Sequence, residues 1–509
     1  MTIVSTAIPA ISQDFQTTED VGWYGSGYFL TMCAFLIFWG RLYTFFNLKG
    51  IYIASIVIFE GGSLICAVAP RSEVFILGRA IAGLGGGGAF AGSLLAVAFS
   101  VPVAKRPMYA SLLGAVYGMS NVFGPIVGGA FVTSRLGWRG CFYMNLPLGA
   151  IVIGFLVPFF TSPVCSAEVA GLSTRTKLKR MDPLGTVVFI AGMTSLLLTL
   201  QWGGQEYPWS GGRIIALLVV FAVTICVWVI WQVYLGPIRA TVPKTVLSQR
   251  SFSFTIFYAF CQGGVNFVML YFTPIWFQGV QGFDAAQSGV RIMTFVLGMG
   301  LAIIATGYAM TTKKARGYSA PFMFLSVVLV SIACGLLTTW TPDTGDAQTF
   351  GYLALYGLGQ GFGWQQPIVM AQTLLPRADI ATGTALSSVC KLLGGTIFVS
   401  ASQNLFNNKF RDEVVQRLPE VDSENLLHIG ITELRKSVDT SLIPVISSCY
   451  NDALRPVWWL LLALSLMSLF GAAGVKWKED PSGLPGGSPK TNPGRNDGQL
   501  SDSSAITKE

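Results

Sequence analysis

The sequence has little charge. Only 11% of its 509 residues are Asp, Glu, Lys or Arg, whereas a typical soluble domain carries about 25%. Hydrophobic residues make up 52% of the chain, and so few charged side chains cannot cover a water-exposed surface of this size. The composition therefore argues against a soluble enzyme and predicts a protein that is surrounded by lipid.

Histidine and paired cysteines are also scarce. The chain has one His, and its nine Cys are scattered singly without a C-x-x-C pair, so neither a zinc site nor a disulfide framework is indicated. No G-x-x-x-x-G-K-[ST] loop occurs, which leaves ATP-driven pumping unsupported. We expect no metal and no cofactor, and a membrane-embedded enzyme or receptor is the weaker alternative.

Long apolar blocks are what the sequence does contain. A helix needs roughly 20 apolar residues to cross about 30 Å of hydrocarbon. A short block at 1–11 precedes longer ones near 21–40, 51–69, 74–99, 109–132, 142–160, 184–200, 214–235, 252–276, 286–310, 320–340, 349–373, 380–404 and 456–475. The sequence therefore predicts an all-α polytopic membrane protein with about 14 transmembrane helices, the first of them truncated.

Basic residues gather in alternate loops between these blocks. One set of loops holds Arg41, Lys49, Lys105, Arg106, Arg175, Lys177, Lys179, Arg180, Arg239, Lys244, Arg250, Lys313, Lys314, Arg316 and Arg377. The other short loops hold only Arg71, Arg135, Arg139, Arg213 and Arg291. The positive-inside rule makes the first set cytoplasmic and, with an even number of spans, both termini too. The net charge of +8 is thus explained by the lipid bilayer, without nucleic acid as a partner.

A faint internal repeat divides the chain. The run 83–87 (GLGGG) is echoed by 357–361 (GLGQG), and each is followed about twenty residues later by a basic turn. Parallel repeats of this kind place a substrate cavity between two halves near the midplane. We expect an N-terminal bundle over 1–160, a linker with two extra helices over 161–250, a C-terminal bundle over 251–475 with an extracellular loop at 405–455, and a disordered tail over 476–509.

A glycine-proline pattern in the fifth long block is the most specific motif. Small residues four apart let two helices approach closely, and a proline removes a backbone hydrogen bond, so this pattern favours a bent, tightly packed helix. Its residues are Ser120, Gly124, Pro125, Gly128 and Gly129. They resemble the antiporter motif G-x-x-x-G-P-x-x-G-G of major facilitator drug:proton exporters, with Ser120 where that family usually has Gly. The alternative is helix packing alone.

Further motifs extend the resemblance over nearly the whole chain. Segments 2–11, 40–49 and 138–149 are similar to the corresponding motifs of the fourteen-span drug:proton antiporters, although Thr44 replaces the usual Asp of the second motif. The set is most similar to the fungal branch that exports toxins and secondary metabolites. The resemblance implies two six-helix bundles plus two inserted helices. It also implies a monomer in the plasma or vacuolar membrane that exports a hydrophobic or amphipathic small molecule in exchange for protons. Siderophore or basic amino-acid transport is the alternative.

Three ionisable residues at membrane depth are candidates for proton coupling. They are Arg79, Glu60 and Lys391. Such residues are costly in hydrocarbon and are functional candidates by default, because they must face a partner or a polar space. Arg79 also begins a segment that resembles the family's R-x-x-x-G-x-G motif.

Uncharged polar and aromatic residues are candidates for a substrate cavity. They are Gln262, Asn266, Tyr271, Gln360, Gln365 and Gln366. Amides among aromatic walls can orient a bulky ligand without requiring that it be charged. Hydrogen bonds between helices explain the amides equally well.

Overall fold

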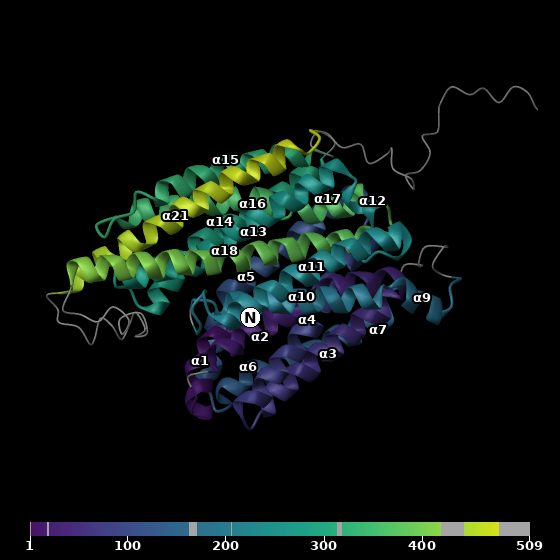
Figure 1. The fold of residues 1–509 in the computed structure, drawn as a ribbon, viewed down its shortest axis with the longest axis horizontal. Helices are drawn as coiled ribbons and strands as arrows, with labels where there is room; N and C mark the ends of the chain where they lie inside the picture. Colours follow the sequence, from purple (N-terminus) through teal and green to yellow (C-terminus); the bar gives the residue numbers. More distant parts are fainter. Residues whose placement is uncertain are drawn as a thin grey trace, which may run out of the picture.

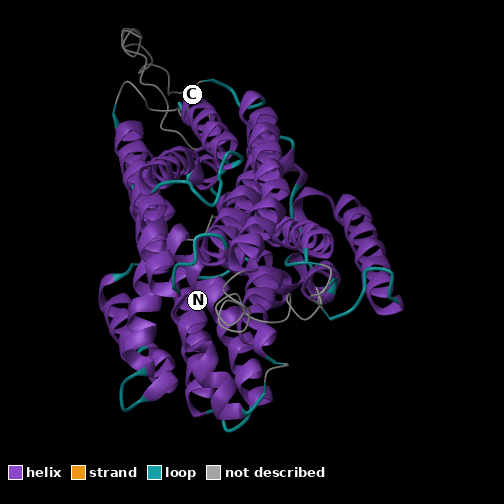
Figure 2. Cartoon of the chain, turned by 90° about the vertical axis from the view of Figure 1, so that its left-hand side faces the viewer, coloured by secondary structure: helices purple, strands orange, loops and turns teal. Residues whose placement is uncertain are grey.

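The computed structural model describes residues 2–17, 20–161, 171–204, 206–312, 318–418 and 442–477. In these ranges the regular structure is helical apart from one isolated bridge between Gly203 and Tyr207 (Figure 2). The predicted all-α membrane fold is confirmed, and 12 of the described helices are long and apolar enough to cross a membrane. Two predicted spans fall outside that number: α1 (Thr2–Phe15) has only 14 residues, and the pair α16 (Asp346–Trp364) and α17 (Gln366–Leu374) is broken at Gln365. The count of fourteen stays a prediction.

The N-terminal half is a bundle held by close helix contacts. Besides α1 it contains α2 (Val21–Phe45), α3 (Leu48–Val68), α4 (Ser72–Ser100), η1 (Val103–Lys105), α5 (Arg106–Val132), η2 (Gly137–Arg139), α6 (Gly140–Tyr143) and α7 (Asn145–Phe159). The glycine run of α4 lies between α2 and α3. A Cβ atom on Gly83 would fall 2.2 Å from the Tyr28 carbonyl oxygen, and one on Gly85 would fall 2.2 Å from the Phe59 nitrogen. Only glycine permits this spacing.

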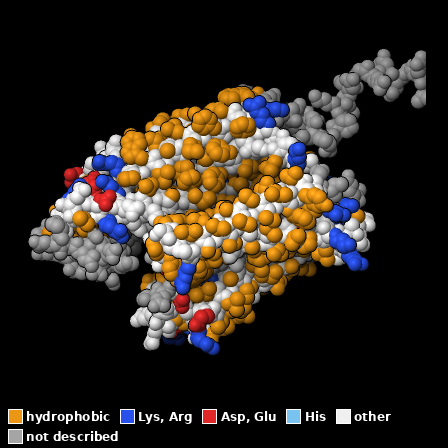
Figure 3. Space-filling view, in the orientation of Figure 1, with side chains coloured by type: hydrophobic (Ala, Val, Ile, Leu, Met, Phe, Trp, Pro, Cys, Tyr) orange, Lys and Arg blue, Asp and Glu red, His pale blue; other side chains and the backbone are white. Residues whose placement is uncertain are grey.

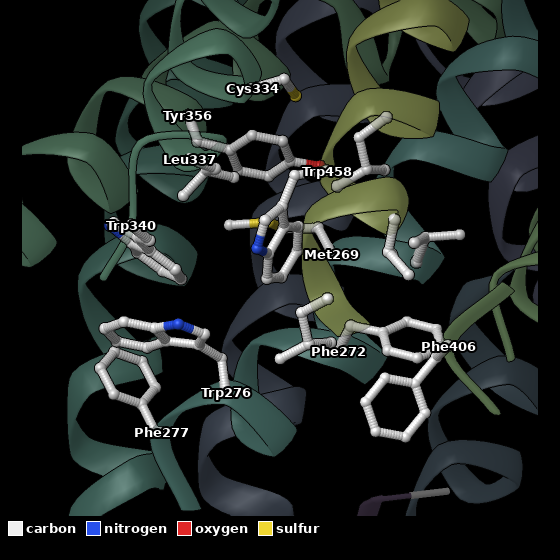
Figure 4. Close-up of a cluster of buried hydrophobic side chains, with 14 of the residues drawn as sticks. Met269, Phe272, Trp276, Phe277, Cys334, Leu337, Trp340, Tyr356, Phe406 and Trp458 are labelled. Carbon is white, nitrogen blue, oxygen red and sulfur yellow. The ribbon is translucent and has the colours of Figure 1, made fainter. Parts of the chain in front are cut away.

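The C-terminal half has an aromatic core. It comprises α13 (Arg250–Gly279), α14 (Ala285–Thr311), α15 (Ser319–Leu337), α16, α17, α18 (Ile380–Arg417) and α21 (Ile443–Ala473). The rings of Trp276 and Trp340 stack with centroids 4.0 Å apart, and Trp458 meets Trp340 edge-on at 5.7 Å (Figure 4). The Trp276 indole nitrogen donates to Oδ1 of Asn451 at 3.0 Å. This cluster joins α13, α15 and α21 into one body.

Two helices extend into the predicted extracellular loop 405–455. α18 continues to Arg417, and α21 begins at Ile443. Glu413 pairs with Lys409 within α18 at 2.8 Å, and the pair between Arg417 and Asp452 at 2.6 Å links the two extensions. Apolar residues repeat at helical spacing between these charges, which is why the segment forms helices. Residues 419–441 of the loop, and the predicted tail from residue 478 onward, lie outside the described residues.

The predicted insertion is a helical hairpin, flanked by short helices. α10 (Pro183–Trp202) and α11 (Gly212–Arg239) lie between α9 (Thr174–Arg180) and α12 (Lys244–Leu247), and α10 also contacts α2 and α18. At one end, Asp182 caps α10 by accepting the Gly185 N–H at 2.9 Å. Its carboxylate also accepts from Trp231 at 2.9 Å and from Thr241 at 2.8 Å, which fixes the hairpin to the chain that follows it.

Charged residues lie at the two ends of the molecule, and an apolar belt separates them (Figure 3). One end holds Lys105, Arg180, Lys244 and Arg377 and is called the basic end below. Contacts keep its loops together: Arg41 donates to the Arg180 carbonyl at 2.9 Å, and Thr245 donates to Asp379 at 3.1 Å. The opposite end holds the Arg139–Asp14 pair at 2.7 Å and the extensions of α18 and α21.

Candidate functional site

The two halves meet along two seams, and the first joins α2 to α18. Near the basic end, a Cβ atom on Gly40 would fall 2.8 Å from Cβ of Ala385. Two turns further along α2, the buried Cys33 lies on the same helix face as Gly40. Gly22 lies on the same face of α2 at the opposite end. A Cβ atom on Gly22 would fall 3.0 Å from Nε2 of Gln201 in α10. The two helices therefore touch at the basic end, and α10 lies beside α2 at the other.

The second seam joins α5 to α14. A Cβ atom on Gly307 would fall 2.4 Å from Oγ of Ser111 and 3.0 Å from the Pro107 carbonyl oxygen. Gly118 and Gly300 lie about two turns further from the basic end on the same helix faces. Neither has a neighbour within 4 Å of its Cβ position. This seam is also closed at the basic end and open toward the other.

Hydrogen bonds from α17 and from Gln365 just before it close the basic end further. The side chain of Gln365 donates to the Ala110 carbonyl of α5 at 2.6 Å, and Gln372 donates to the Leu94 carbonyl of α4 at 3.1 Å. In return Arg106 of α5 donates to the Gln372 carbonyl at 2.5 Å. Figure 1 shows the halves converging on this end and diverging toward the other. Among the described residues, these direct contacts between the two bundles lie toward the basic end.

Lys391 lies in the first third of α18, about 17 Å along the helix from its start. Its side chain is only 6% exposed. The ammonium donates to the carbonyl oxygen of Trp364 and lies 4.3 Å from the centroid of that indole ring. Trp364 ends α16, so the break at Gln365 leaves this carbonyl available. Among the described residues no carboxylate forms an ion pair with Lys391.

Arg79 is buried inside the N-terminal half, with 4% of its surface exposed. Its Nε donates to the Tyr24 carbonyl at 2.8 Å, and the guanidinium lies 4.7 Å from the centroid of the Tyr28 ring. A guanidinium does not lose its proton in proteins. Arg79 can therefore attract or orient a neighbouring group, but it cannot itself carry the coupled proton.

Glu60 faces away from both of these residues. A Cβ atom on Gly149 of α7 would fall 2.2 Å from its Oε1, so the carboxyl packs between α3 and α7. Its Oε2 is buried without a hydrogen-bond partner among the described residues. The three residues predicted for proton coupling thus point toward different helices: Glu60 toward α7, Arg79 toward α2 and Lys391 toward α16.

The predicted cavity residues do not gather on one wall. Gln360 donates to the Gln262 carbonyl at 3.2 Å, and Gln262 donates to Ser468 of α21 at 2.9 Å, inside the C-terminal half. Gln366 donates to Sδ of Met310 at 3.5 Å. Asn266 is buried, whereas Tyr271 is 47% exposed. Most of these amides connect helices, as the alternative interpretation expects, and substrate contact by any of them stays a prediction.

Comparisons with known proteins identify the family. The family model described as Major Facilitator Superfamily matches residues 1–399. The MFS-type efflux pump MFS1 of Trichophyton rubrum is 43% identical over 94% of this chain and 88% of its own length. Efflux pump aflT of Aspergillus parasiticus is 42% identical over 94% of this chain and 92% of its own length. The chain belongs to the Major Facilitator Superfamily.

Solved structures of facilitators agree in fold. The human organic anion transporter MFSD10 matches with a TM-score of 0.53 and 12% identity, covering 90% of this chain and 88% of that one. The proton:xylose symporter XylE matches with a TM-score of 0.52 and 14% identity, covering 92% and 90%. This facilitator is therefore a membrane transporter by family, and the resemblance predicted from its motifs is confirmed.

The antiporter-like motif of this facilitator packs α5 against α1. A Cβ atom on Gly128 would fall 2.3 Å from Oγ1 of Thr6, whereas one on Gly129 would have no neighbour within 4 Å. Ser120 donates to the Val116 carbonyl within its own helix at 2.8 Å. Pro125 lies inside the helix next to Gly124, as expected. The motif therefore joins two helices of one half rather than the two halves.

Two groups of this facilitator were not predicted from its sequence. One is the set of bonds from α17 across the seam, in which Gln372 and Arg106 take part. The Gln365–Gln366–Pro367 sequence inside an apolar block is the signal that could have indicated a discontinuous helix at the contact. The other is an aromatic group on α2, α4 and α5, described below. The described residues contain no group of three or more metal-ligating side chains.

Proposed function

We propose that this facilitator exports a hydrophobic or amphipathic small molecule in exchange for protons, by alternating access. Its relatives are named efflux pumps. By the positive-inside rule the basic end is cytoplasmic, as are both termini. The bundles over 1–160 and 251–475 are the two moving halves, with residues 161–250 as the insertion. The protein would act as a monomer, in the plasma membrane rather than the vacuolar membrane.

The observation that carries the proposal is the one-sided contact between the halves. Glycines allow close contact at the basic end of both seams. The faces of α5 and α14 lie apart two turns further on, and at the far end of α2 the neighbour of Gly22 belongs to α10 and not to α18. With the basic end in the cytoplasm, this is a state open to the outside. Because packed interfaces switch between discrete arrangements, rocking about these seams gives a second state open to the cytoplasm.

Lys391 is the residue to which we assign the coupled proton. Lysine can lose its proton when it is buried, unlike arginine. Only the protonated side chain makes a charge-assisted bond to the Trp364 carbonyl. The next residue, Gln365, donates to Ala110 across the seam. Proton binding at Lys391 thereby stabilises the break in α16–α17 and, through it, the contact between the halves.

Efflux of Nile red, an uncharged amphipathic dye, tests the proposal. Cells that express the chain should retain less dye than cells with an empty vector, and a protonophore should abolish the difference. Dye efflux that continues unchanged with the protonophore present would contradict proton coupling. Equal retention in both kinds of cell would contradict efflux of this class of compound.

Variants of Lys391 test the proton site in vesicles with an imposed pH gradient. Lys391→Arg keeps the charge but cannot release it, so dye transport should no longer respond to the gradient. Lys391→Met should have the same effect. Lys409→Met, on an exposed part of the same helix, is the matched control and should transport normally. A full response to the gradient in Lys391→Arg would exclude Lys391 as the proton site.

A further inference from the structure

Three aromatic residues form a group in the N-terminal half. They come from α2, α4 and α5: Tyr28, Phe90 and Tyr117. The rings of Phe90 and Tyr117 lie with centroids 6.2 Å apart at an angle of 55°. The Tyr28 hydroxyl lies against Gly86, one turn before Phe90 on the same side of α4. Three helices therefore bring their rings to one place.

This group faces the space between the halves. The outer face of α5 is an apolar stripe in which Leu112, Val116 and Phe123 are each 53% exposed. At 100° per residue, Tyr117 lies about 140° around the helix from Leu112, away from that stripe. Tyr117 is nevertheless 41% exposed, next to Gly118, where the α5–α14 seam is open. The exposed ring of Tyr117 lies near the middle of α5, on the side away from the outer stripe, and we infer that it borders the space between the two halves.

Packing holds the group in place. A Cβ atom on Gly86 would fall 2.2 Å from the Tyr28 hydroxyl, so only glycine at this position lets the ring lie against α4. The guanidinium of Arg79 lies 4.7 Å from the centroid of the same ring and is itself fixed by the Tyr24 carbonyl. Rings that are held before a ligand arrives lose little entropy on binding it.

The chemistry of the group indicates its ligand. Flat aromatic rings favour contact with another aromatic system. Among the described residues, neither phenol hydroxyl has a hydrogen-bond partner, so both are available as donors. The positive charge of Arg79 against the Tyr28 ring favours an electron-rich oxygen nearby.

We propose that Tyr28, Phe90 and Tyr117 bind the exported molecule and select planar aromatic compounds that carry a carbonyl oxygen. The inference rests on the proposed efflux function, because it assigns the class of cargo. It does not depend on proton coupling or on the direction of transport. It concerns only the binding of the molecule to the observed state, which is closed at the basic end.

Binding to the purified full chain in detergent micelles tests the assignment. The probes are acridone, a planar aromatic ketone, and anthracene, a ring system of the same size without the carbonyl. Tyr117→Phe should weaken acridone binding about fivefold and leave anthracene unchanged, because it removes only a hydrogen bond. Tyr117→Ala should weaken both about tenfold or more, because it also removes the ring.

Phe123→Ala, on the outer stripe of the same helix, is the matched control and should bind both probes as the unaltered protein does. The proposal is overturned if Tyr117→Ala and Phe123→Ala bind acridone equally well, or if Tyr117→Phe weakens both probes by the same factor. A lack of dye efflux from cells together with selective acridone binding would instead contradict the transport function and leave the binding site standing.

Discussion

Replacing Gly307 by valine should shift the halves away from the observed state. The new Cβ atom would fall 2.4 Å from Oγ of Ser111 and 3.0 Å from a backbone oxygen, and neither can move far. Overpacking of this kind costs about 1–3 kcal/mol. The cost applies only to the observed state, in which α14 touches α5. The population of this state should therefore fall roughly 5- to 150-fold relative to the state in which the two helices are apart at the basic end.

Cross-linking of Cys33 on α2 to Cys390 on α18 by a bifunctional thiol reagent reports this population, because these two helices form the other seam and touch each other near Gly40. The experiment uses membranes in which the remaining cysteines are serine. Gly307→Val should slow cross-linking, and Ser111→Gly should restore it by removing the obstructing side chain. Gly300→Val, on the same face where no atom lies within 4 Å, should not slow it. Unchanged cross-linking in a correctly inserted Gly307→Val protein would refute the reasoning.

Two further predictions concern the antiporter-like motif and the basic end. Gly128→Leu should block dye efflux at normal membrane abundance, because its side chain would collide with Thr6, whereas Gly129→Leu should remain active since its Cβ position is open; equal efflux by both variants would remove the role of the α1–α5 contact. Burial raises the pKa of Asp379, although the Thr245 hydroxyl and Arg41 act in the opposite direction. A carboxyl whose pKa is raised by folding contributes stability at low pH. This stability is lost as the pH rises above 3.8, the usual pKa of the carboxyl. Asp379→Asn should make the melting temperature depend less on pH in that range. A pH dependence parallel to that of the unaltered protein would contradict this assignment.

The membrane fold was predictable because its causes are local. Low charge, apolar blocks and basic loops follow directly from the cost of placing polar groups in lipid. The length of α18 was underestimated because the polar part beyond residue 404 resembles a solvated loop, although its ion pairs and apolar residues recur at helical spacing.

The candidate site was less predictable, because its geometry depends on how the halves meet. Lys391 and Gln365 could be recognised as polar residues in apolar blocks. The sequence could not show that Lys391 bonds to Trp364 and that Gln365 bonds to the opposite half. Tyr28 and Tyr117 look like ordinary membrane aromatics in the sequence. What distinguishes them is the place of Tyr117 beside the open part of a seam and that of Tyr28 against Gly86 of α4.

The inserted hairpin reaches both halves at the end away from the basic loops. Trp202 of α10 packs edge-on against Trp23 of α2 at 5.9 Å. On the other side, the α18 residues Ser400 and Asn404 bond to the Leu200 carbonyl at 3.0 Å and to Trp209 at 2.7 Å. In the rocking motion proposed above, α2 and α18 would approach each other here and push the hairpin tip sideways into the surrounding lipid. The lateral pressure of the bilayer then opposes that step, so the stiffness of the host membrane should influence how fast the transporter turns over.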